Sequence, residues 1–263
     1  MNKASLAGKH ILVTRAKEQA KVLSQRIREA GGIPIEVPLL AFQRPQNQEV
    51  IPEVISRLAE FDWLVFTSAN GVRFFMEHFQ DNTKNKNVRL PKIAVVGIET
   101  AKVLHLYKVK ADVSPDVYVA ESLIDCLKEN TEPGQRILLA RGNLGRSILN
   151  DNLLTYGLEV TDLIVYETVL PKEAIIEMKT LLDKSMIPDV VTFTSSSTVQ
   201  HFIQLLQKIN QSERFNPVMA CIGPVTAQTA KKLGLSVEII PKTYTVEGLV
   251  QAICTYIEEE NLK

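Results

Sequence analysis

DWLVFTSANGVRFF, from Asp62 to Phe75, is the stretch of sequence that decides the fold. Its first part is continuously apolar, as in a strand that is covered on both faces of a sheet. Small hydroxyl and amide residues follow from Thr67 to Gly71, and an apolar pattern with helical spacing begins after them. The stretch therefore predicts a buried strand, a polar turn and a helix. DVVTFTSSSTVQHF, from Asp189 to Phe202, has the same plan.

These two stretches belong to a repeat that runs along the whole chain. Thr67 matches Thr194 at an offset of 127 residues. Other pairs have an offset of 126: Arg15 with Arg141, Gly97 with Gly223, Thr100 with Thr226, Pro115 with Pro241 and Glu121 with Glu247. One such match arises easily by chance, but a nearly constant offset along the chain does not. The sequence therefore indicates two copies of one unit of about 126 residues.

Each copy alternates apolar, β-branched runs with helical patterns. The runs are ILVTR, WLVFTS and IAVVG in the first copy, and ILLARG, VVTFTS and MACIG in the second. Strands that alternate with helices predict βαβ units and a parallel sheet. Because the crossovers are right-handed, the turns from strand to helix share one edge of the sheet. We therefore expect an α/β fold.

Two equivalent segments interrupt this rhythm, IPIEVPLLAF at residues 33–42 and EVTDLIVYET at residues 159–168. Both look extended, and Pro34 and Pro38 resist helix formation in the first. We interpret residues 33–42 and 159–169 as paired linker strands between two domains. The domains then need not coincide with the repeats, because the chain can start one sheet, build the second and cross back.

Composition excludes several classes of protein. The 263 residues are 45% hydrophobic, with 30 Lys+Arg and 30 Asp+Glu, so the basic excess of a nucleic-acid-binding protein is missing. The N-terminus lacks the apolar core of a signal peptide, and no apolar run approaches the length of a membrane span. The three cysteines are widely spaced and suggest neither a disulfide set nor a metal site. We expect a soluble cytosolic protein.

Six turns between a strand and a helix are candidates for a ligand site, because ligands of open α/β sheets bind at the carboxyl ends of the strands. They are residues 14–15, 67–71, 97–100, 141–143, 194–198 and 223–226. The start of a helix presents unpaired N–H groups and a partial positive charge, which suits carboxylates or phosphates. Ser68 and Ser195 either cap their helices alone or also bind a ligand, and the sequence leaves both interpretations open.

Other catalytic motifs are missing from the sequence. It contains neither a phosphate-binding G-x-x-x-x-G-K-[ST] loop nor a dinucleotide-binding G-x-G-x-x-G motif. The four histidines are scattered and suggest packed or solvated side chains rather than metal ligands. Tyr166 is the only tyrosine in the predicted linkers, and its phenol has a proton to donate. It is either an aromatic packed between domains or a catalytic acid.

Seven short motifs, taken in order, resemble the uroporphyrinogen-III synthase family. They are TR, TSANGVRFF, VGxxTA, LARG, VYET, TFTSSSTV and IGPVTA, and together they extend from Thr14 to Ala227. The resemblance covers essentially the whole chain, and the order and spacing of the motifs are more specific than any one of them.

This resemblance implies two similar, flavodoxin-like α/β domains with parallel sheets, joined by a two-stranded β linker in a crossed topology. Residues 1–36 and 170–263 would form one domain, and residues 43–160 the other. It also implies a monomeric lyase without metal or organic cofactor, and without nucleic-acid or membrane partners. The reaction would close the linear tetrapyrrole hydroxymethylbilane, with inversion of ring D and loss of water, in haem, sirohaem or cobalamin synthesis.

The matched motifs also imply roles for individual residues. Tyr166 would be the proton donor. The expected substrate contacts are Thr67, Ser68, Asn70, Gly97, Thr100, Ser195, Ser197 and Thr226, followed by Thr14, Arg15, Arg141 and Gly142. One alternative is a two-lobed cytosolic binding module for a small polyanionic ligand. Another is an enzyme of phosphorylated sugars or nucleotides, for which the sequence lacks a histidine or an acid–base pair at a turn.

Overall fold

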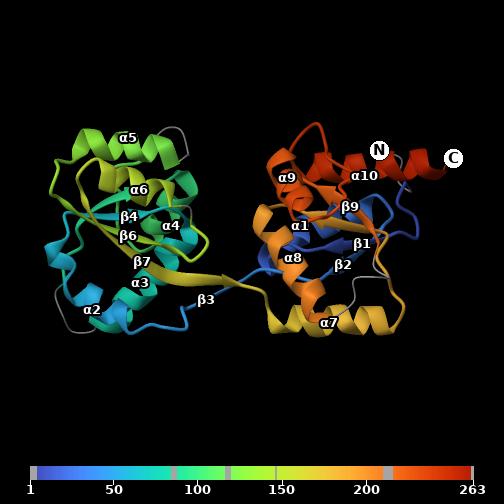
Figure 1. The fold of residues 1–263 in the computed structure, drawn as a ribbon, viewed down its shortest axis with the longest axis horizontal. Coiled ribbons are helices and arrows are strands. Elements are labelled where there is room, and N and C mark those ends of the chain that lie inside the picture. Colours follow the sequence, from blue (N-terminus) through green and yellow to red (C-terminus); the bar gives the residue numbers. More distant parts are fainter. Residues whose placement is uncertain (1–4, 84–87, 116–119, 146, 210–215, 262–263) are drawn as a thin grey trace. The chain divides into compact units, whose positions relative to one another are not determined.

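The chain forms two compact units in a computed structural model that describes residues 5–83, 88–115, 120–145, 147–209 and 216–261. The discontinuous unit comprises Met1–Ala41 and Val169–Lys263, and the central unit comprises Phe42–Thr168. The chain therefore passes from one unit to the other twice, as its colours show in Figure 1. No helix in the described ranges is long and apolar enough to cross a membrane.

The discontinuous unit is built on a four-stranded parallel sheet with the order β2-β1-β8-β9. The strands are β1 (His10–Val13), β2 (Ile33–Glu36), β8 (Val190–Phe193) and β9 (Val218–Cys221). Helices α7 (Lys172–Asp183), α8 (Ser196–Ile209) and α9 (Pro224–Lys232) pack on one face. Helices α1 (Lys17–Glu29) and α10 (Val246–Asn261) pack on the other face. The unit thus has three layers.

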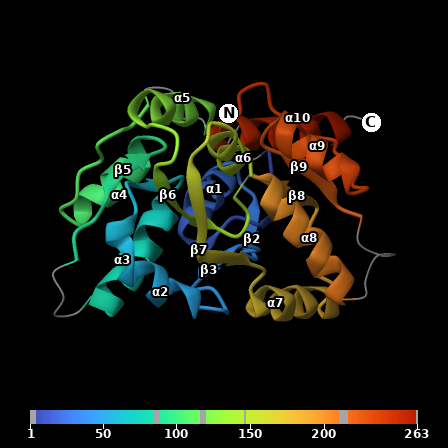
Figure 2. The same ribbon diagram turned by 60° about the vertical axis from the view of Figure 1, so that its left-hand side comes forward.

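The central unit is built on a five-stranded sheet with the order β3-β7-β6-β4-β5. The strands are β3 (Ala41–Gln43), β4 (Trp63–Phe66), β5 (Lys92–Val95), β6 (Arg136–Gly142) and β7 (Glu159–Val169). Helices α2 (Val50–Ser56), α3 (Ala69–Thr83) and α4 (Ile98–Leu106) contribute to the core on one face, with the 3-10 helix η1 (Leu58–Glu60) after α2. Helices α5 (Ala120–Asn130) and α6 (Ile148–Thr155) pack on the other face, and Figure 2 shows this layering.

The continuous apolar run of β4 has the structural role that its sequence predicts. Leu64 and Phe66 pack into the cluster formed with α2, α3 and α4, whereas Trp63 and Val65 pack into the cluster formed with α5 and α6. All four side chains are at most 2% exposed. A strand covered on both faces needs apolar residues at consecutive positions, because neighbouring side chains point to opposite faces.

The internal repeat is confirmed by the order of the strands. At the repeat offset, β2, β1, β8 and β9 correspond to β7, β6, β4 and β5, and these four hold the same order in the two sheets. An isolated parallel bridge lies beside the outer strand of each sheet: Ala94 of β5 pairs with Val113, and Ala220 of β9 pairs with Ile239. The two copies therefore fold alike, although each unit takes its elements from both copies.

Parts of the segments predicted as linker strands, residues 33–42 and 159–169, also pair inside the two sheets. Ile33–Glu36 is the edge strand β2, in parallel with β1, and the residues from Glu159 to Tyr166 pair with β6 inside the central sheet. The edge strand accommodates Pro34, because a strand with a single neighbour tolerates a residue without an N–H. Between the predicted segments themselves, β3 lies next to β7.

Candidate active site

The turn after β4 brings Ser68 to the start of α3. The Gly71 N–H donates to Ser68 Oγ at 3.0 Å, and the Val72 N–H donates to the Ser68 carbonyl at 3.2 Å. Ser68 is therefore the N-cap of α3, as the sequence predicted. Thr67 precedes it and Asn70 lies in the first turn of the helix, both half-buried.

Tyr166 of β7 reaches the same turn. Its hydroxyl lies 3.2 Å from Ser68 Oγ, within hydrogen-bonding distance. The ring stacks on Phe74 of α3, with centroids 5.4 Å apart and planes at 21°, and meets Phe42 of β3 edge-on at 5.9 Å. The two candidate residues predicted from separate motifs therefore touch. The packing of Phe42 and Phe74 around the tyrosine had no signal in the sequence, because it depends on how β3, β7 and α3 come together.

Arg141 and Gly142, at the end of β6, both contact other residues of the central unit. The Arg141 guanidinium makes two hydrogen bonds to the Asp162 carboxylate of β7, and its Nη1 also donates to the Gly145 carbonyl at 2.6 Å. The bond to Asp162 raises the pKa of Arg141 above its usual value. Arg141 is thus engaged within its own unit. Gly142 is buried and lies against the Tyr166 ring.

The second turn of the central unit, after β5, depends on a glycine. Gly97 is the N-cap of α4 with φ 82°, in the left-handed region that other residues avoid. Thr100 follows in the first turn of α4 and is only 4% exposed. The G-x-x-T-A pattern therefore has a structural role at this position.

In the discontinuous unit, hydroxyl groups cluster in the turn after β8. Ser195 Oγ accepts a hydrogen bond from the Thr198 N–H at 3.3 Å and lies 3.0 Å from Ser197 Oγ. Thr198 Oγ1 donates to the Ser195 carbonyl at 2.6 Å. Ser195 thus caps α8 as Ser68 caps α3. In the neighbouring turn, Thr226 lies in the first turn of α9 and is 6% exposed.

Thr14 and Arg15 follow β1 and differ in whether their polar groups have hydrogen-bond partners. Thr14 is fully buried, and its hydroxyl donates to the Thr192 carbonyl at 2.6 Å, so that it joins β1 to β8. Arg15 Nη2 donates to Gln19 Oε1 at 3.2 Å, while Arg15 Nε is buried and has no hydrogen-bond partner among the described residues. Burial lowers the pKa of Arg15 below its usual value.

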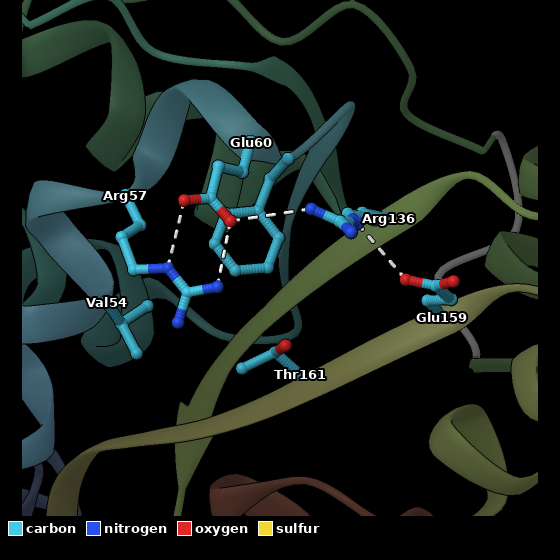
Figure 3. A pocket seen from close by; sticks show the side chains of 7 residues that line it. Val54, Arg57, Glu60, Arg136, Glu159 and Thr161 are labelled. Carbon is cyan, nitrogen blue, oxygen red and sulfur yellow. Dashed lines mark hydrogen bonds and ion pairs between the residues drawn. The ribbon is translucent and has the colours of Figure 1, made fainter.

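Figure 3 shows a pocket of about 210 Å³ at the opposite edge of the central sheet, where β6 and β7 begin. Its charges are already paired: Arg57 with Glu60 at 2.8 Å, and Arg136 with Glu159 at 3.1 Å and with Glu60 at 3.4 Å. These exposed ion pairs satisfy one another and leave no net charge for a ligand. The pocket also lies away from the turns, so we do not assign the active site to it.

Two histidines and two cysteines are packed inside the units, as expected. His78 Nε2 of α3 lies 3.2 Å from the Val165 carbonyl, and His201 Nδ1 of α8 lies 2.8 Å from the Leu39 carbonyl. Burial lowers the pKa of both imidazoles. Burial also raises the pKa of the Cys221 thiol to about 12, and Cys254 is buried as well. These groups support the structure rather than a site.

A tyrosine hydroxyl held at a capped helix N-terminus can donate a proton, and the helix starts within each unit can bind anionic groups. Comparisons with known proteins show to which family the chain belongs. The family described as uroporphyrinogen-III synthase HemD matches residues 21–251. The uroporphyrinogen-III synthase of Synechococcus elongatus is 34% identical over 258 residues, which cover 96% of this chain and 97% of the relative. The chain therefore belongs to the uroporphyrinogen-III synthase family.

Solved structures of similar fold agree with this assignment. A uroporphyrinogen III synthase mutant from Thermus thermophilus matches with a TM-score of 0.59 at 16% identity, over 96% of this chain and 100% of the other. The uroporphyrinogen-III synthetase of Helicobacter pylori matches with a TM-score of 0.59 at 20% identity, over 94% and 99%. At such identities the matches show a common α/β fold with parallel sheets.

Proposed function

We propose that this protein closes hydroxymethylbilane to uroporphyrinogen III, with inversion of ring D and loss of water. The proposal rests on membership of the family, and one structural observation supports it above the others. The Tyr166 hydroxyl lies 3.2 Å from Ser68 Oγ, so that a proton donor and a capped helix start lie together. A phenol is a weak acid, and a positioned weak acid is sufficient for this step.

The reaction requires one protonation and a controlled conformation. Tyr166 gives its proton to the hydroxyl on the ring A methylene, the C–O bond breaks, and water leaves. Ring D then attacks the resulting azafulvenium cation through its substituted carbon, and the spiro intermediate fragments and recloses. The proton that ring D loses when it becomes aromatic again restores Tyr166. The spontaneous reaction closes without inversion, so the main task of the protein is to hold one folded conformer.

The substrate is a flexible polycarboxylate, and the capped turns suit its acid groups. Arg15 is the strongest candidate for a charged contact, because its Nε is buried without a partner in the described part of the chain. Ser197, Asn70 and Thr67 are half-buried at helix starts and can add hydrogen bonds. Gly97 lets a ligand approach the backbone closely. Thr14, Thr100, Thr226 and Arg141 are ranked lower, because they are buried or already bonded.

The remaining expectations belong to the same proposal. The two units would act as flavodoxin-like domains with β3 and β7 as their two-stranded linker, in a cytoplasmic monomer that needs neither a metal nor an organic cofactor. The pairing of β3 with β7 and the two chain passages between the units support the linker. The product would enter haem, sirohaem or cobalamin synthesis.

A direct assay tests the function. Purified protein is incubated with hydroxymethylbilane, and the uroporphyrinogen isomers are separated after oxidation. We expect the type III isomer to form faster than the spontaneous product. The type I isomer alone, at the spontaneous rate, would contradict the proposal, and binding without turnover would instead identify a polyanion-binding module.

Tyr166→Phe tests the proton donor within the same assay. General acid catalysis typically contributes about 100-fold or more, so we expect kcat to fall by about that factor. Tyr156→Phe is the matched control, because Tyr156 lies in the same unit and its hydroxyl donates to the Lys128 carbonyl at 3.1 Å. Unchanged turnover in Tyr166→Phe would remove Tyr166 from the mechanism.

A further inference from the structure

Tyr166 is restrained on several sides within the central unit. Phe74 covers one face of its ring, and Phe42 contacts it edge-on. Near the ring, the register of β6 and β7 shifts, so that Arg141 is opposite Ile164 but Gly142 is opposite Tyr166. Such irregularities in a ladder redirect side chains locally. The backbone therefore contributes to aiming Tyr166 at the turn after β4.

Gly142 provides the space that this orientation requires. A Cβ atom at this position would lie 2.6 Å from Cε2 and 2.8 Å from the hydroxyl oxygen of Tyr166, far inside normal contact distance. Any other residue would therefore displace the ring or the strand. The other copy of the repeat has Ala16 at the position of Gly142 and Leu40 at that of Tyr166. The copy with the tyrosine therefore has the glycine, and the copy without the tyrosine has a larger residue at that position.

The hydrogen bonds of Ser68 allow it to stabilise negative charge that develops on the Tyr166 oxygen. Its oxygen already accepts from the Gly71 N–H at 3.0 Å, and it lies 3.2 Å from the Tyr166 hydroxyl. A serine hydroxyl has one proton and two lone pairs, so Ser68 can still donate that proton to the tyrosine oxygen. The Gly71 N–H belongs to the positive end of α3, which favours negative charge nearby.

We propose that Ser68 and Gly142 are positioning residues for proton transfer from Tyr166, beyond the substrate contacts that their motifs imply. This inference rests on the proposed function of Tyr166. Ser68 donates to the tyrosine oxygen, which leaves the tyrosine proton free for the departing hydroxyl group of the substrate. When that proton has moved and water has left, the Ser68 hydrogen bond stabilises the phenolate until the proton from ring D returns. Gly142 keeps the ring where this bond can form.

A double-mutant cycle separates this role from capping and from substrate binding. Ser68→Ala should lower kcat about 10-fold, as expected for the loss of one hydrogen bond to a charged group, and leave KM within about twofold. In the Tyr166→Phe background the same change should have little further effect on kcat, because the bond no longer exists. Ser68→Thr should restore most of the activity, since it keeps a hydroxyl group and a cap.

Ser195→Ala is the matched control, because Ser195 caps α8 as Ser68 caps α3. It removes the same kind of cap from the unit that lacks Tyr166, so its effect should multiply with that of Tyr166→Phe. Losses from Ser68→Ala that also multiply with Tyr166→Phe, or that appear in KM, would overturn the inference. If Tyr166→Phe alone leaves kcat unchanged, the proposed proton donor fails and the positioning role fails with it.

Gly142→Ala gives an independent test in the folded protein. The added methyl group should reduce kcat at least as much as Ser68→Ala, and the combination with Tyr166→Phe should again be less than multiplicative. Circular dichroism and the melting temperature confirm that the variant is folded. A folded Gly142→Ala protein with unchanged kcat would overturn the role of the glycine.

Discussion

The central and discontinuous units share a strand order, but different side chains surround the N-cap serine in their equivalent turns. Ser68 caps α3 and meets the Tyr166 hydroxyl, whereas Ser195 caps α8 and meets other hydroxyl groups, among them that of Ser197. The repeat equivalent of Tyr166 is Leu40, which has no proton to donate. Duplication thus provided two similar helix starts, and the change of a few neighbouring residues gave only one of them a candidate acid.

The two repeat-related arginines show the same divergence. Arg141 is bonded to Asp162 and to the Gly145 carbonyl, and its side chain is only 12% exposed. Arg15 donates to Gln19 but keeps a buried Nε without a hydrogen-bond partner in the described part of the chain. The guanidinium of Arg141 is therefore bonded within its unit, whereas that of Arg15 keeps an N–H group without a partner among the described residues.

The largest of these effects is expected when each arginine is replaced with alanine, because one variant should change substrate binding and the other should change stability. Arg15→Ala should raise KM for hydroxymethylbilane by about 10-fold or more, because a charge-assisted hydrogen bond to a carboxylate is lost. Arg141→Ala should instead lower the free energy of unfolding, by about 2 kcal/mol for a partly buried pair that loses one partner. Steady-state kinetics and chemical denaturation measure the two effects. An equal rise in KM for both variants would show that both arginines bind the substrate.

A smaller effect distinguishes the two G-x-x-T-A turns. Gly97→Ala should lower the free energy of unfolding by about 1–2 kcal/mol, because φ 82° is unfavourable for a residue with a Cβ atom. Gly223→Ala is the matched control, since its φ of −169° is extended and an added Cβ would lie 3.4 Å from the nearest atom of Tyr244. Its stability should change by less than about 0.5 kcal/mol. Equal losses would contradict this difference.

The smallest effect concerns the pH dependence of stability. Burial lowers the pKa of His78 and His201, so the folded state binds these protons less readily than the unfolded state. Stability is therefore complete above the unfolded pKa of about 6.5 and declines as the pH falls below it. Each histidine should contribute less than about 1 kcal/mol of loss between pH 7 and pH 6, measured by urea denaturation. His78→Gln and His201→Gln should each reduce this dependence, and a dependence unchanged in both would contradict it.

The sequence predicted the repeat, the strands and the contents of the turns, because these depend on local patterns of residues. Pro34 and Pro38 indicated an extended segment, but they could not show that Ile33–Glu36 pairs with β1 as an edge strand. The sequence also could not distinguish the hydrogen-bond partners of Arg15 from those of Arg141. The partner of Arg141, Asp162, lies on the neighbouring strand β7, and it becomes a neighbour only when β6 and β7 pair. The restraint of Tyr166 by Gly142 likewise depends on the shifted register of these strands.

The double passage of the chain between the units has a consequence during synthesis on the ribosome. All strands of the central sheet lie between Ala41 and Val169, so this unit can fold while the rest of the chain is still being translated. In the other unit, β1 must wait for its neighbour β8, which follows it by about 180 positions. Until then one edge of β1 lacks its partner strand, and an unpaired strand edge can pair with other chains.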